Sequence, residues 1–419
     1  MNDLFIIAAT RTPFCKMGTD LAGLTADDLG RAACSALLTE TAIDPGELSE
    51  VILGCVAQPS EAANIARVIA LRSGIPQHVP AVTVHRNCAS GMESVTTAHQ
   101  RIAAGQGDLF LVGGVESMTH IPLLFPHEAA LHFADLNRAK SSGQKLSAAA
   151  SFNLSDFKPR VGIELGLTDP FTGLIMGDTA EILAREFGIS REQQDRFAAD
   201  SHLKAIAARE MLNAEISPVY TDAGAVTEDN GIRTDSTPEK LATLRPIFDR
   251  TTGTVTAGNS SQITDGAVAI LVGTEAAANR LGIEPLGRLS AYAYSGCDPA
   301  RMGLGPVHAI ARAKQLSGLS PDDADLIEIN EAFAAQVLAC LASLKDPKTH
   351  RLDLPSYEIP AEKLNRRGGA IALGHPVGAT GARLVLTALD QLRETGGHRA
   401  LATLCIGGGQ GAALYLERP

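Results

Sequence analysis

The chain has no tryptophan, and aromatic residues make up only 4% of its 419 residues. It also lacks an apolar run long enough to span a bilayer, a basic N-terminal segment and an Arg-rich targeting signal. Lysine and arginine form no basic stripe, and the net charge is −11. These absences argue against a membrane-spanning protein and against a nucleic-acid partner, and we expect a cytoplasmic protein.

Closely spaced cysteine pairs are missing as well. The seven cysteines are scattered, without a Cys-x-x-Cys motif, at Cys15, Cys34, Cys55, Cys88, Cys297, Cys340 and Cys405. An odd number of widely spaced cysteines indicates neither a disulfide framework nor a zinc site. We therefore expect a reducing compartment.

Small residues are abundant instead. The chain contains 40 glycines, and apolar residues make up 45% of it. This composition suggests close helix–sheet packing and tight backbone turns, which are typical of α/β enzymes. The length exceeds one ordinary compact core, so we expect two or three domains or a duplicated one.

The order of predicted elements repeats in the two halves. In the first half, a helical period over 28–38 and a turn precede an apolar strand at 51–54. In the second half, a helical period over 307–316 and a turn with capping residues precede a strand at 325–330.

Two further matches follow in the same order. The segment 87–91 opens an Ala-rich helix, and the segment 374–381 opens an Ala- and Leu-rich helix. Each helix is followed by an apolar strand, at 108–114 and at 399–408. The three matches predict two copies of one βαβ-containing unit. Each copy places a Gly-rich turn and a helix N-terminus after a strand, where α/β sheets usually hold their sites.

A stretch of different character lies between the copies. From about 120 to 265, polar segments alternate with helical pieces at 178–187 and 191–212. We interpret this stretch as a loop domain inserted into the first copy. Long insertions of this kind usually serve as a lid, a ligand clamp or a partner surface.

Cys88 is a candidate nucleophile. It follows an apolar run at 79–84 and falls at the first turn of a predicted helix, where backbone N–H groups and the helix dipole favour a thiolate. The following Ala89, Ser90 and Gly91 leave room for a substrate. The alternative is a small buried cysteine that fills a helix–sheet contact.

His375 occupies the equivalent helix start in the second copy, within a Gly-His-Pro turn. If the copies pack about a pseudo-dyad, the two helix N-termini converge, and His375 can take the proton of Cys88. The alternative is a histidine that is hydrogen-bonded to a loop carbonyl.

Two more residues carry candidate chemistry. Cys405 ends an apolar strand and leads into a Gly-rich turn that contains Gly407, where backbone N–H groups can approach an oxyanion. The thiol can act as a general acid or base, although an ordinary strand-to-strand turn is the alternative. Asn330 ends a strand, where its amide can hold a water or a carbonyl. Taken alone, Asn330 is better interpreted as the N-cap of the next helix, with Glu331 in its first turn.

Together these segments resemble the thiolase family. The motifs Asn-Cys-Ala-Ser-Gly at 87–91, Asn-Glu-Ala-Phe at 330–333, Gly-His-Pro-Val-Gly-Ala-Thr-Gly at 374–381 and Cys-Ile-Gly-Gly-Gly-Gln-Gly at 405–411 occur in the family's order. The segments Arg-Thr-Pro-Phe and Thr-Val-Thr-Ala-Gly-Asn-Ser-Ser fit as well, so the resemblance covers nearly the whole chain.

The resemblance implies a duplicated α/β thiolase fold, in which two βαβ-containing halves pack as a five-layered α-β-α-β-α core with an inserted loop domain. The expected division is 1–119 plus 248–272 for the N-terminal half, 120–247 for the loop domain that binds CoA or acts as a lid, and 273–419 for the C-terminal half.

The resemblance also implies catalytic roles. Cys88 would be the acylated nucleophile, His375 the base that activates it, and Cys405 the acid or base at the α-carbon of acetyl-CoA. Asn330, through a water, and His375 would bind the thioester oxygen of CoA. The backbone N–H groups of Cys88 and Gly407 would stabilise the tetrahedral intermediate.

Four further residues would contact the substrate. Ser261 aligns with the serine at the pantetheine chain, and Arg233 with a basic residue near the adenine. Met176 and Met302 fall where family members line the pocket near the acyl group. CoA and acyl-CoA would enter as substrates, and the resemblance implies neither a permanently bound cofactor nor a metal.

The implied reaction is that of an acetyl-CoA C-acyltransferase, the CoA-dependent thiolytic cleavage of a 3-ketoacyl-CoA, which reverses a Claisen condensation. A biosynthetic acetoacetyl-CoA thiolase is the alternative, and a catalytically silent CoA-ester-binding or scaffold protein is a further one. A decarboxylating ketoacyl synthase would carry histidines in place of Cys405 and Asn330.

The loop domain, around 135–140 and 176–181, resembles that of β-subunits from fatty-acid-oxidation complexes. This implies a homodimer or homotetramer with a hydratase/dehydrogenase subunit as partner. Those β-subunits often carry histidine where this chain has Asn330. Ile175 replaces a histidine of short-chain biosynthetic members, which favours a broader or longer acyl substrate.

Overall fold

The main β-sheet contains two runs of strands with the same order of pairing. The computed structural model describes residues 3–348 and 354–419. In spatial order, the first run is β4 (Ala81–Val84), β3 (Glu50–Gly54), β5 (Leu109–Glu116), β10 (Thr264–Gly273) and β1 (Leu4–Arg11). The second run is β12 (Leu326–Ile329), β13 (Arg399–Ile406), β14 (Gln410–Glu417) and β11 (Gly287–Gly296).

The pairing directions of the two runs match strand by strand. β3 is parallel to β5, as β12 is to β13. β10 lies antiparallel between β5 and β1, as β14 lies antiparallel between β13 and β11. The runs join where Leu4–Ile6 of β1 pairs briefly with Gly287–Leu289 of β11, and β2 (Cys15–Lys16) pairs with β10. This repeated pairing is what the duplication in the sequence predicts.

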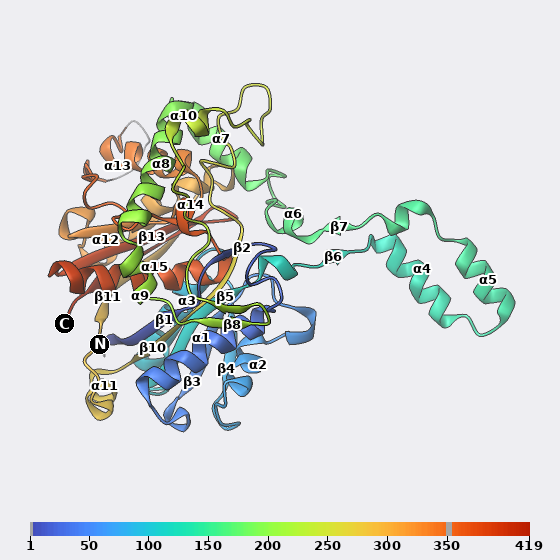
Figure 1. The fold of residues 1–419 in the computed structure, drawn as a ribbon, viewed down its shortest axis with the longest axis horizontal. Helices are drawn as coiled ribbons and strands as arrows, with labels where there is room; N and C mark the ends of the chain where they lie inside the picture. Colours follow the sequence, from blue (N-terminus) through green and yellow to red (C-terminus); the bar gives the residue numbers. More distant parts are fainter. Residues whose placement is uncertain (1–2, 349–353) are drawn as a thin grey trace.

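Helices form three layers around the two runs of strands (Figure 1). The outer face of the first run is covered by α1 (Ala26–Thr41), α2 (Ile65–Arg72) and α11 (Glu275–Leu281). α3 (Ser90–Ala103) and α15 (Val377–Thr395) lie between the runs. α12 (Gly305–Ser317) and α13 (Ala334–Lys345) cover the outer face of the second run. The predicted five-layered α-β-α-β-α core is confirmed.

Strands β5 and β10, at the centre of the first run, are buried on both faces. In β5, Leu109 and Leu111 pack under the outer helices, whereas Phe110 and Val112 point into the middle layer. Successive side chains of a strand point to opposite faces of the sheet. A strand between two helical layers is therefore apolar throughout, and for that reason β5 reads as a continuous apolar run.

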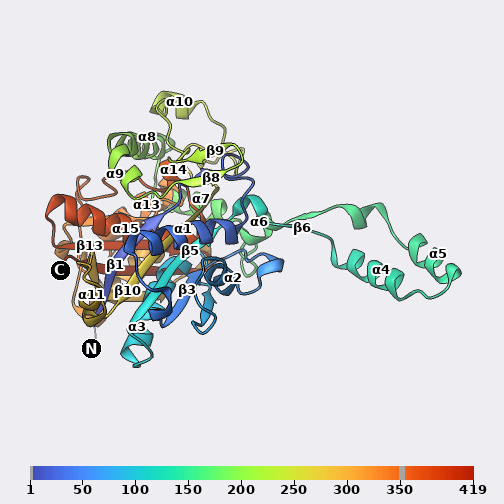
Figure 2. The same cartoon turned by 60° about the horizontal axis from the view of Figure 1, so that its bottom comes forward.

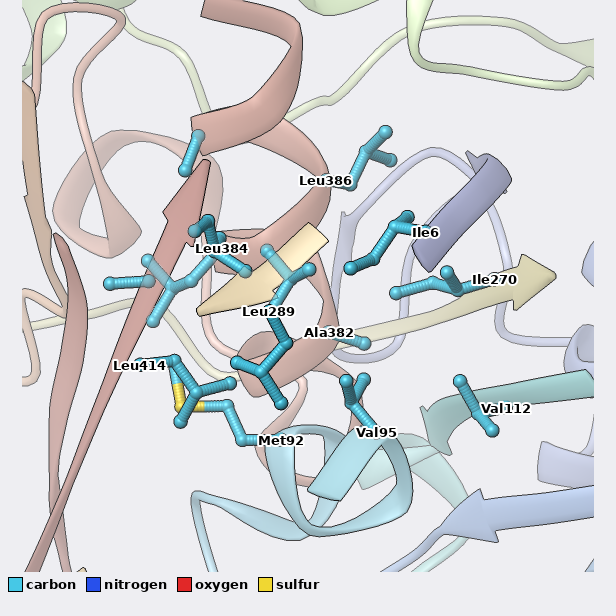
Figure 3. Packing of buried hydrophobic residues seen from close by; sticks show 14 of the residues in the cluster. Ile6, Met92, Val95, Val112, Ile270, Leu289, Ala382, Leu384, Leu386 and Leu414 are labelled. Atoms are coloured by element: carbon cyan, nitrogen blue, oxygen red, sulfur yellow. The ribbon is translucent and has the colours of Figure 1, made fainter. Parts of the chain in front are cut away.

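The two middle helices pack unusually closely, because glycines lie at their contact. A Cβ atom on Gly91 of α3 would lie 2.5 Å from the backbone nitrogen of Ala382, and one on Gly381 of α15 would lie 2.7 Å from that of Met92. Side chains from both helices and from the flanking strands fill the core around this contact (Figure 3). The close approach fixes the N-terminal ends of the two helices relative to each other.

The segment between β5 and β10 forms two parts. One is an arm that stands away from the core in both views (Figures 1 and 2). Its legs are β6 (Leu123–Leu124) and β7 (Arg160–Val161), and its tip carries α4 (His127–Arg138) and α5 (Ser142–Ala150). The remaining elements are α6 (Gly162–Gly166), α7 (Met176–Glu186), α8 (Arg191–Ala207), α9 (Arg209–Ala214), α10 (Pro238–Ala242), β8 (Val219–Thr221) and β9 (Gly224–Val226).

The second part of this segment packs on the core, and the helix predicted over 191–212 is divided there into α8 and α9. A short helix, α14 (Ala370–Leu373), precedes α15 and lies against α8. Within the described part of the chain, no helix combines the length and apolarity that a bilayer crossing requires.

Candidate active site

One cavity of about 600 Å³ lies where the two halves and the loop segment meet. Most of the residues that the sequence singled out line it, namely Cys88, His375, Cys405, Gly407, Ser261, Met176 and Met302. The cavity has the size of a site for a small organic ligand. The pseudo-symmetric packing of the two middle helices brings these residues together, although hundreds of residues separate them in the sequence.

Cys88 and His375 occupy equivalent positions in the two halves. Helix α3 begins at Ser90 and α15 begins at Val377, so each residue lies two positions before its helix. The prediction that Cys88 belongs to the first helical turn is therefore wrong by two residues. The residue before each one has a positive φ, of +43° at Asn87 and +99° at Gly374. Both side chains thus follow a residue with a positive φ.

The pKa of the Cys88 thiol is raised to about 11. Burial is the main cause, and the carboxylate of Glu116 adds to it. The backbone N–H groups of Gly407 and of Cys88 itself donate toward the sulfur and oppose this rise. The expectation of a lowered thiol pKa is thus wrong, because loss of solvation outweighs the N–H groups. Cys88 is a neutral thiol at rest.

His375 is held as a neutral imidazole of one tautomer. Its Nδ1 lies 2.6 Å from the hydroxyl oxygen of Thr380. That hydroxyl donates its own proton to the carbonyl of Pro376 at 3.0 Å, so it accepts the Nδ1 proton. Burial, together with the charge of Arg383, lowers the pKa of His375 to about 4. Nε2 therefore carries the free lone pair and can accept a proton.

Cys405 lies at the end of β13 and is buried. Burial raises the pKa of its thiol well above the usual value, and the nearby Cys88 adds to the effect. The two thiols are thus electrostatically coupled neighbours in one apolar pocket. Two protonated thiols and a neutral imidazole thus line one cavity, and groups of this kind can transfer protons to a bound substrate.

Gly407 lies in the turn between β13 and β14. Its carbonyl accepts a hydrogen bond of 2.7 Å from the side-chain amide of Asn87. The next two residues, Gly408 and Gly409, have φ values of +88° and +79°, in the region that favours glycine. The turn therefore brings bare backbone N–H groups to the edge of the cavity.

Asn330 follows β12 directly but does not cap a helix. α13 begins at Ala334 with Phe333 as its N-cap, so the interpretation of Asn330 as an N-cap is wrong. Its side chain is fully buried, and neither its amide oxygen Oδ1 nor its amide nitrogen Nδ2 has a hydrogen-bond partner among the described residues. The flanking Glu331 is instead held by Ser201. Because buried amides are normally hydrogen-bonded, we expect a polar molecule such as water to bind Asn330.

Three of the four residues predicted to contact substrate line the cavity, and one does not. Ser261 lies at the cavity wall, and its N–H donates to the carbonyl of Ala332. Met176 opens α7, and Met302 is buried beside it in the same apolar cluster. Arg233 is exposed and does not line the cavity. It lies near Lys16 and His202, whose pKa values are lowered mainly by burial and further by the charge of Arg233.

Glu116 is a cavity residue that the sequence analysis missed. Its buried carboxylate accepts hydrogen bonds from the backbone N–H groups of Val56, Ala57 and Gly378, at 3.1, 2.9 and 2.9 Å. Burial raises its pKa despite these donors. The signal available in the sequence was a lone carboxylate at the end of a strand that is otherwise entirely apolar.

Apolar side chains from the base of the arm form another part of the cavity wall. Ile121 precedes β6, and Ile163, Leu165 and Leu167 follow β7. The two legs touch here, because a Cβ atom on Gly162 would lie 2.4 Å from the carbonyl oxygen of Pro122. No group of His, Cys, Asp or Glu side chains in residues 3–348 and 354–419 is arranged to hold a metal ion.

Comparison with known proteins covers almost the whole chain. The model of the N-terminal thiolase domain matches residues 4–276, and that of the C-terminal thiolase domain matches residues 283–418. A 3-ketoacyl-CoA thiolase of Yersinia enterocolitica is 39% identical over 98% of this chain and 96% of its own length. A probable acetyl-CoA acyltransferase of Staphylococcus aureus is 40% identical over the full length of both chains.

Solved structures agree with these relatives. The human mitochondrial 3-ketoacyl-CoA thiolase in complex with CoA superposes with a TM-score of 0.85 at 36% identity, covering 100% of this chain and 98% of that one. An acetyl-CoA acetyltransferase of Bacillus anthracis superposes with a TM-score of 0.87 at 35% identity, covering 100% and 99%. With its fold, its two family domains and its full-length relatives in agreement, the chain belongs to the thiolase family.

Proposed function

We propose that this enzyme is an acetyl-CoA C-acyltransferase that cleaves 3-ketoacyl-CoA with CoA, giving acetyl-CoA and a shortened acyl-CoA. The observation that carries the proposal is the cavity in which two thiols, Cys88 and Cys405, lie with the neutral imidazole of His375 and the Gly407 turn. A nucleophilic thiol, a base and a second acid are the groups that the reaction requires.

In the first half-reaction, Nε2 of His375 takes the proton of Cys88 while the sulfur attacks the 3-keto carbon of the substrate. The N–H groups of Cys88 and Gly407 stabilise the oxyanion that forms on that carbon. The C2–C3 bond then breaks, and its electron pair stays on C2. Cys405 gives its proton to C2, and acetyl-CoA leaves the acyl group on Cys88.

The second half-reaction restores the enzyme. The Cys405 thiolate takes the proton of an incoming CoA thiol, whose sulfur attacks the acyl carbon on Cys88. The Cys88 sulfur leaves and recovers its proton from His375. Cys88, His375 and Cys405 thereby end in their starting protonation states. The overall result is the transfer of the CoA thiol proton to the methyl group of acetyl-CoA. Condensation follows the same steps in reverse, with Cys405 removing the α-proton.

The raised thiol pKa values suit this sequence of steps. With Cys88 at about 11 and His375 at about 4, no thiolate–imidazolium pair exists before substrate binds. The proton must move as the new sulfur–carbon bond forms. Asn330, whose buried amide has no protein partner, would hold a water that binds the thioester oxygen of CoA together with His375.

The apolar wall at the base of the arm supports an acyl substrate longer than acetoacetyl. Ile121, Ile163 and Leu167 border the cavity beside Met176, and burying each methylene of an acyl chain there contributes about 0.8 kcal/mol. For CoA itself, Ser261 would contact the pantetheine chain. Arg233, beside Lys16 on the outer surface, would meet the nucleotide end.

Biosynthetic acetoacetyl-CoA synthesis is the second candidate, because both kinds of enzyme are among the relatives of this chain. It uses the same catalytic groups and differs in the length of acyl chain accepted. A silent CoA-ester-binding or scaffold protein is disfavoured, since such a protein has no need to keep both thiols and the histidine in one cavity.

We also infer a homodimer or homotetramer. Strand β4 is the last strand of its run, so one of its edges has no partner strand among the described residues. Its four residues are only half-buried, and unprotected strand edges tend to pair with another chain. A second copy at this edge would lie next to the Cys88 loop. The solution mass, measured by light scattering, tests this inference, and a monomer would contradict it.

The arm is the proposed docking site for a hydratase/dehydrogenase subunit. It exposes large apolar side chains, namely Leu123, Leu124, Phe125, Leu131, Leu146, Leu154 and Phe157. Clusters of this kind mark interaction surfaces. A double variant with Leu146→Glu and Leu154→Glu, which alters only exposed positions, should lose the partner on gentle lysis while thiolysis is kept. Isolation of the wild type without that subunit would contradict the assignment.

A cytoplasmic location completes the proposal. All seven cysteines are free thiols, and three of them, Cys15, Cys34 and Cys55, are buried in the first half alone. Free thiols at this density fit a reducing compartment. Fractionation of the native host tests the location, and recovery from an oxidising compartment would contradict it.

The deciding experiment is thiolysis of 3-ketoacyl-CoAs with four to sixteen carbons by the wild type and by Cys88→Ala. Cleavage of the longer chains by the wild type, together with an inactive variant, supports the degradative assignment. Reaction with acetoacetyl-CoA alone would favour the biosynthetic candidate. A wild type that is inactive on every chain length would overturn the catalytic proposal in favour of a binding protein.

A further inference from the structure

Asn87, the residue before Cys88, corresponds to Gly374, the residue before His375. Asn87 therefore carries a side chain where the second half has a glycine. In the second half, the residue before His375 is Gly374, at φ +99°. A Cβ atom there would lie 2.3 Å from Cγ2 of Thr264, so no side chain fits. In the first half, Asn87 also has a positive φ, of +43°. Glycine would adopt this bend without strain, which suggests that the asparagine side chain is needed for something else.

The side chain of Asn87 reaches across to the second half of the fold. Its Nδ2 donates to the carbonyl oxygen of Gly407 at 2.7 Å, in a half-buried position. The turn at Gly407 consists of three glycines and has no side chain of its own with which to hold its shape. Its other end is fixed separately, because the N–H of Cys297 donates to the carbonyl of Gly409 at 2.7 Å.

The backbone of Asn87 is itself fixed. Its carbonyl accepts from both the N–H and the hydroxyl of Ser90, at 3.0 and 2.7 Å. The hydroxyl oxygen of Ser90 in turn accepts the N–H of Arg86 at 2.9 Å. The loop that carries Cys88 is thus closed on itself, and Asn87 offers Gly407 a rigid anchor rather than a mobile side chain.

Gly407 is consequently held on two sides by adjacent residues. Its carbonyl is bound by Asn87, while its N–H donates toward the sulfur of Cys88. The N–H of Gly407 and the nucleophile come from different halves of the chain, 319 positions apart, and the Asn87 bond is a direct link between them. Catalytic donors act only when they are placed within a few tenths of an ångström of the developing charge.

We propose that Asn87 is a positioning residue that sets the Gly407 N–H against the oxyanion that forms on the acyl carbon bound to Cys88. The inference rests on the proposed function, because the oxyanion it serves forms during acyl transfer. Asn87 does not touch the substrate in this role. It acts through Gly407, and its loss leaves the nucleophile in place while the oxyanion loses a well-placed donor.

The test uses Asn87→Gly, which keeps the bend and removes the tether, and Asn87→Asp, which turns an oxygen toward the Gly407 carbonyl. Ala42→Gly is the matched control, because Ala42 also has a positive φ, of +52°, and is exposed at the C-cap of α1. We expect kcat for thiolysis to fall on the order of 10- to 100-fold in Asn87→Gly and further in Asn87→Asp. KM for CoA should change less than about twofold, because no CoA contact is altered.

Alkylation of Cys88 by iodoacetamide is the second readout, because that reaction uses no oxyanion hole. Its rate should fall far less than kcat in Asn87→Gly, because burial rather than the Gly407 N–H is the main influence on the Cys88 thiol pKa. A kcat within twofold of the wild type would overturn the inference. A parallel fall in kcat and alkylation would also overturn it, since Asn87 would then shape the Cys88 loop alone. If the wild type neither cleaves 3-ketoacyl-CoA nor becomes acylated on Cys88, the proposed function fails, and this inference fails with it.

Discussion

The carboxylate of Glu116, at the end of β5 in the first half, accepts a hydrogen bond of 2.9 Å from the backbone N–H of Gly378, at the start of α15 in the second half. The same carboxylate binds the N–H groups of Val56 and Ala57. One buried side chain thus joins three segments that border the cavity. Gly378 lies three positions after His375, so this clamp also supports the segment that carries His375.

We expect Glu116→Gln to lower both stability and activity. The amide of glutamine would turn an N–H group toward a backbone N–H, leaving a buried donor unpaired at a cost of about 1–3 kcal/mol. Chemical denaturation measures this loss, and kcat should fall with it because the start of α15 is loosened. Glu61→Gln, at an exposed position, is the control. Equal stability of the two variants would contradict the clamp.

The reactivity of Cys88 should rise with pH without a plateau near neutrality. Because burial raises its pKa to about 11, the thiolate fraction grows about tenfold for each pH unit between 7 and 9. The alkylation rate with iodoacetamide should follow this slope, with Cys88→Ala providing the background from other thiols. A rate that levels off near pH 7 would mean that His375 already holds Cys88 as a thiolate.

Thr380→Val should lower kcat while the fold stays intact. Valine has nearly the same shape, but it removes the oxygen that accepts the Nδ1 proton of His375. The imidazole then loses the bond that selects its tautomer, and we expect kcat to fall by about 10- to 100-fold. Thr380→Ser restores the hydroxyl and should recover most of the activity. A Thr380→Val enzyme as active as the wild type would show that the bond is dispensable.

Cys405→Ala should separate two partial reactions. Exchange of the acyl group between acetyl-CoA and labelled CoA makes and breaks only sulfur–acyl bonds, and the thiol proton that Cys405 relays there can also be lost to water, so we expect this exchange to fall far less. Cleavage of the C2–C3 bond and exchange of the α-protons of acetyl-CoA with D₂O need an acid or base at C2. Both should fall by at least about 100-fold. Deuterium incorporation at the wild-type rate would remove Cys405 from this role.

Arg11→Met should destabilise the protein strongly. The guanidinium of Arg11 is buried and binds Asp229 at 2.7 and 2.8 Å and Glu215 at 2.9 Å. Removing it leaves the buried Asp229 without its cation and Glu215 with Arg367 alone, which costs about 3–5 kcal/mol. The exposed Arg280, which pairs with Glu47 and Asp108 at the surface, is the control, and Arg280→Met should cost less than about 1 kcal/mol. Similar melting temperatures would contradict this difference.

The sequence by itself determined the duplicated fold, because the evidence for it is local. Helical periods, turn residues and fully apolar strands recur in the same order, and the elements α1, β3, α3 and β5 recur as α12, β12, α15 and β13. The candidate residues Cys88, His375 and Cys405 were visible for a similar reason. Each lies at or just after the end of a strand, or in a Gly-rich turn, and such places are recognised from neighbouring residues alone.

Only the tertiary structure decided the electrostatics and the long-range tethers. The sequence placed Cys88 at a helix N-terminus and predicted a lowered thiol pKa, whereas the folded protein raises it. Solvation depends on every element packed around the thiol, and no local pattern records it. The bond from Asn87 to Gly407 and the clamp of Glu116 on Gly378 join residues hundreds of positions apart. Such contacts exist only after the two halves have packed about α3 and α15, because their geometry is set by the close approach of those helices.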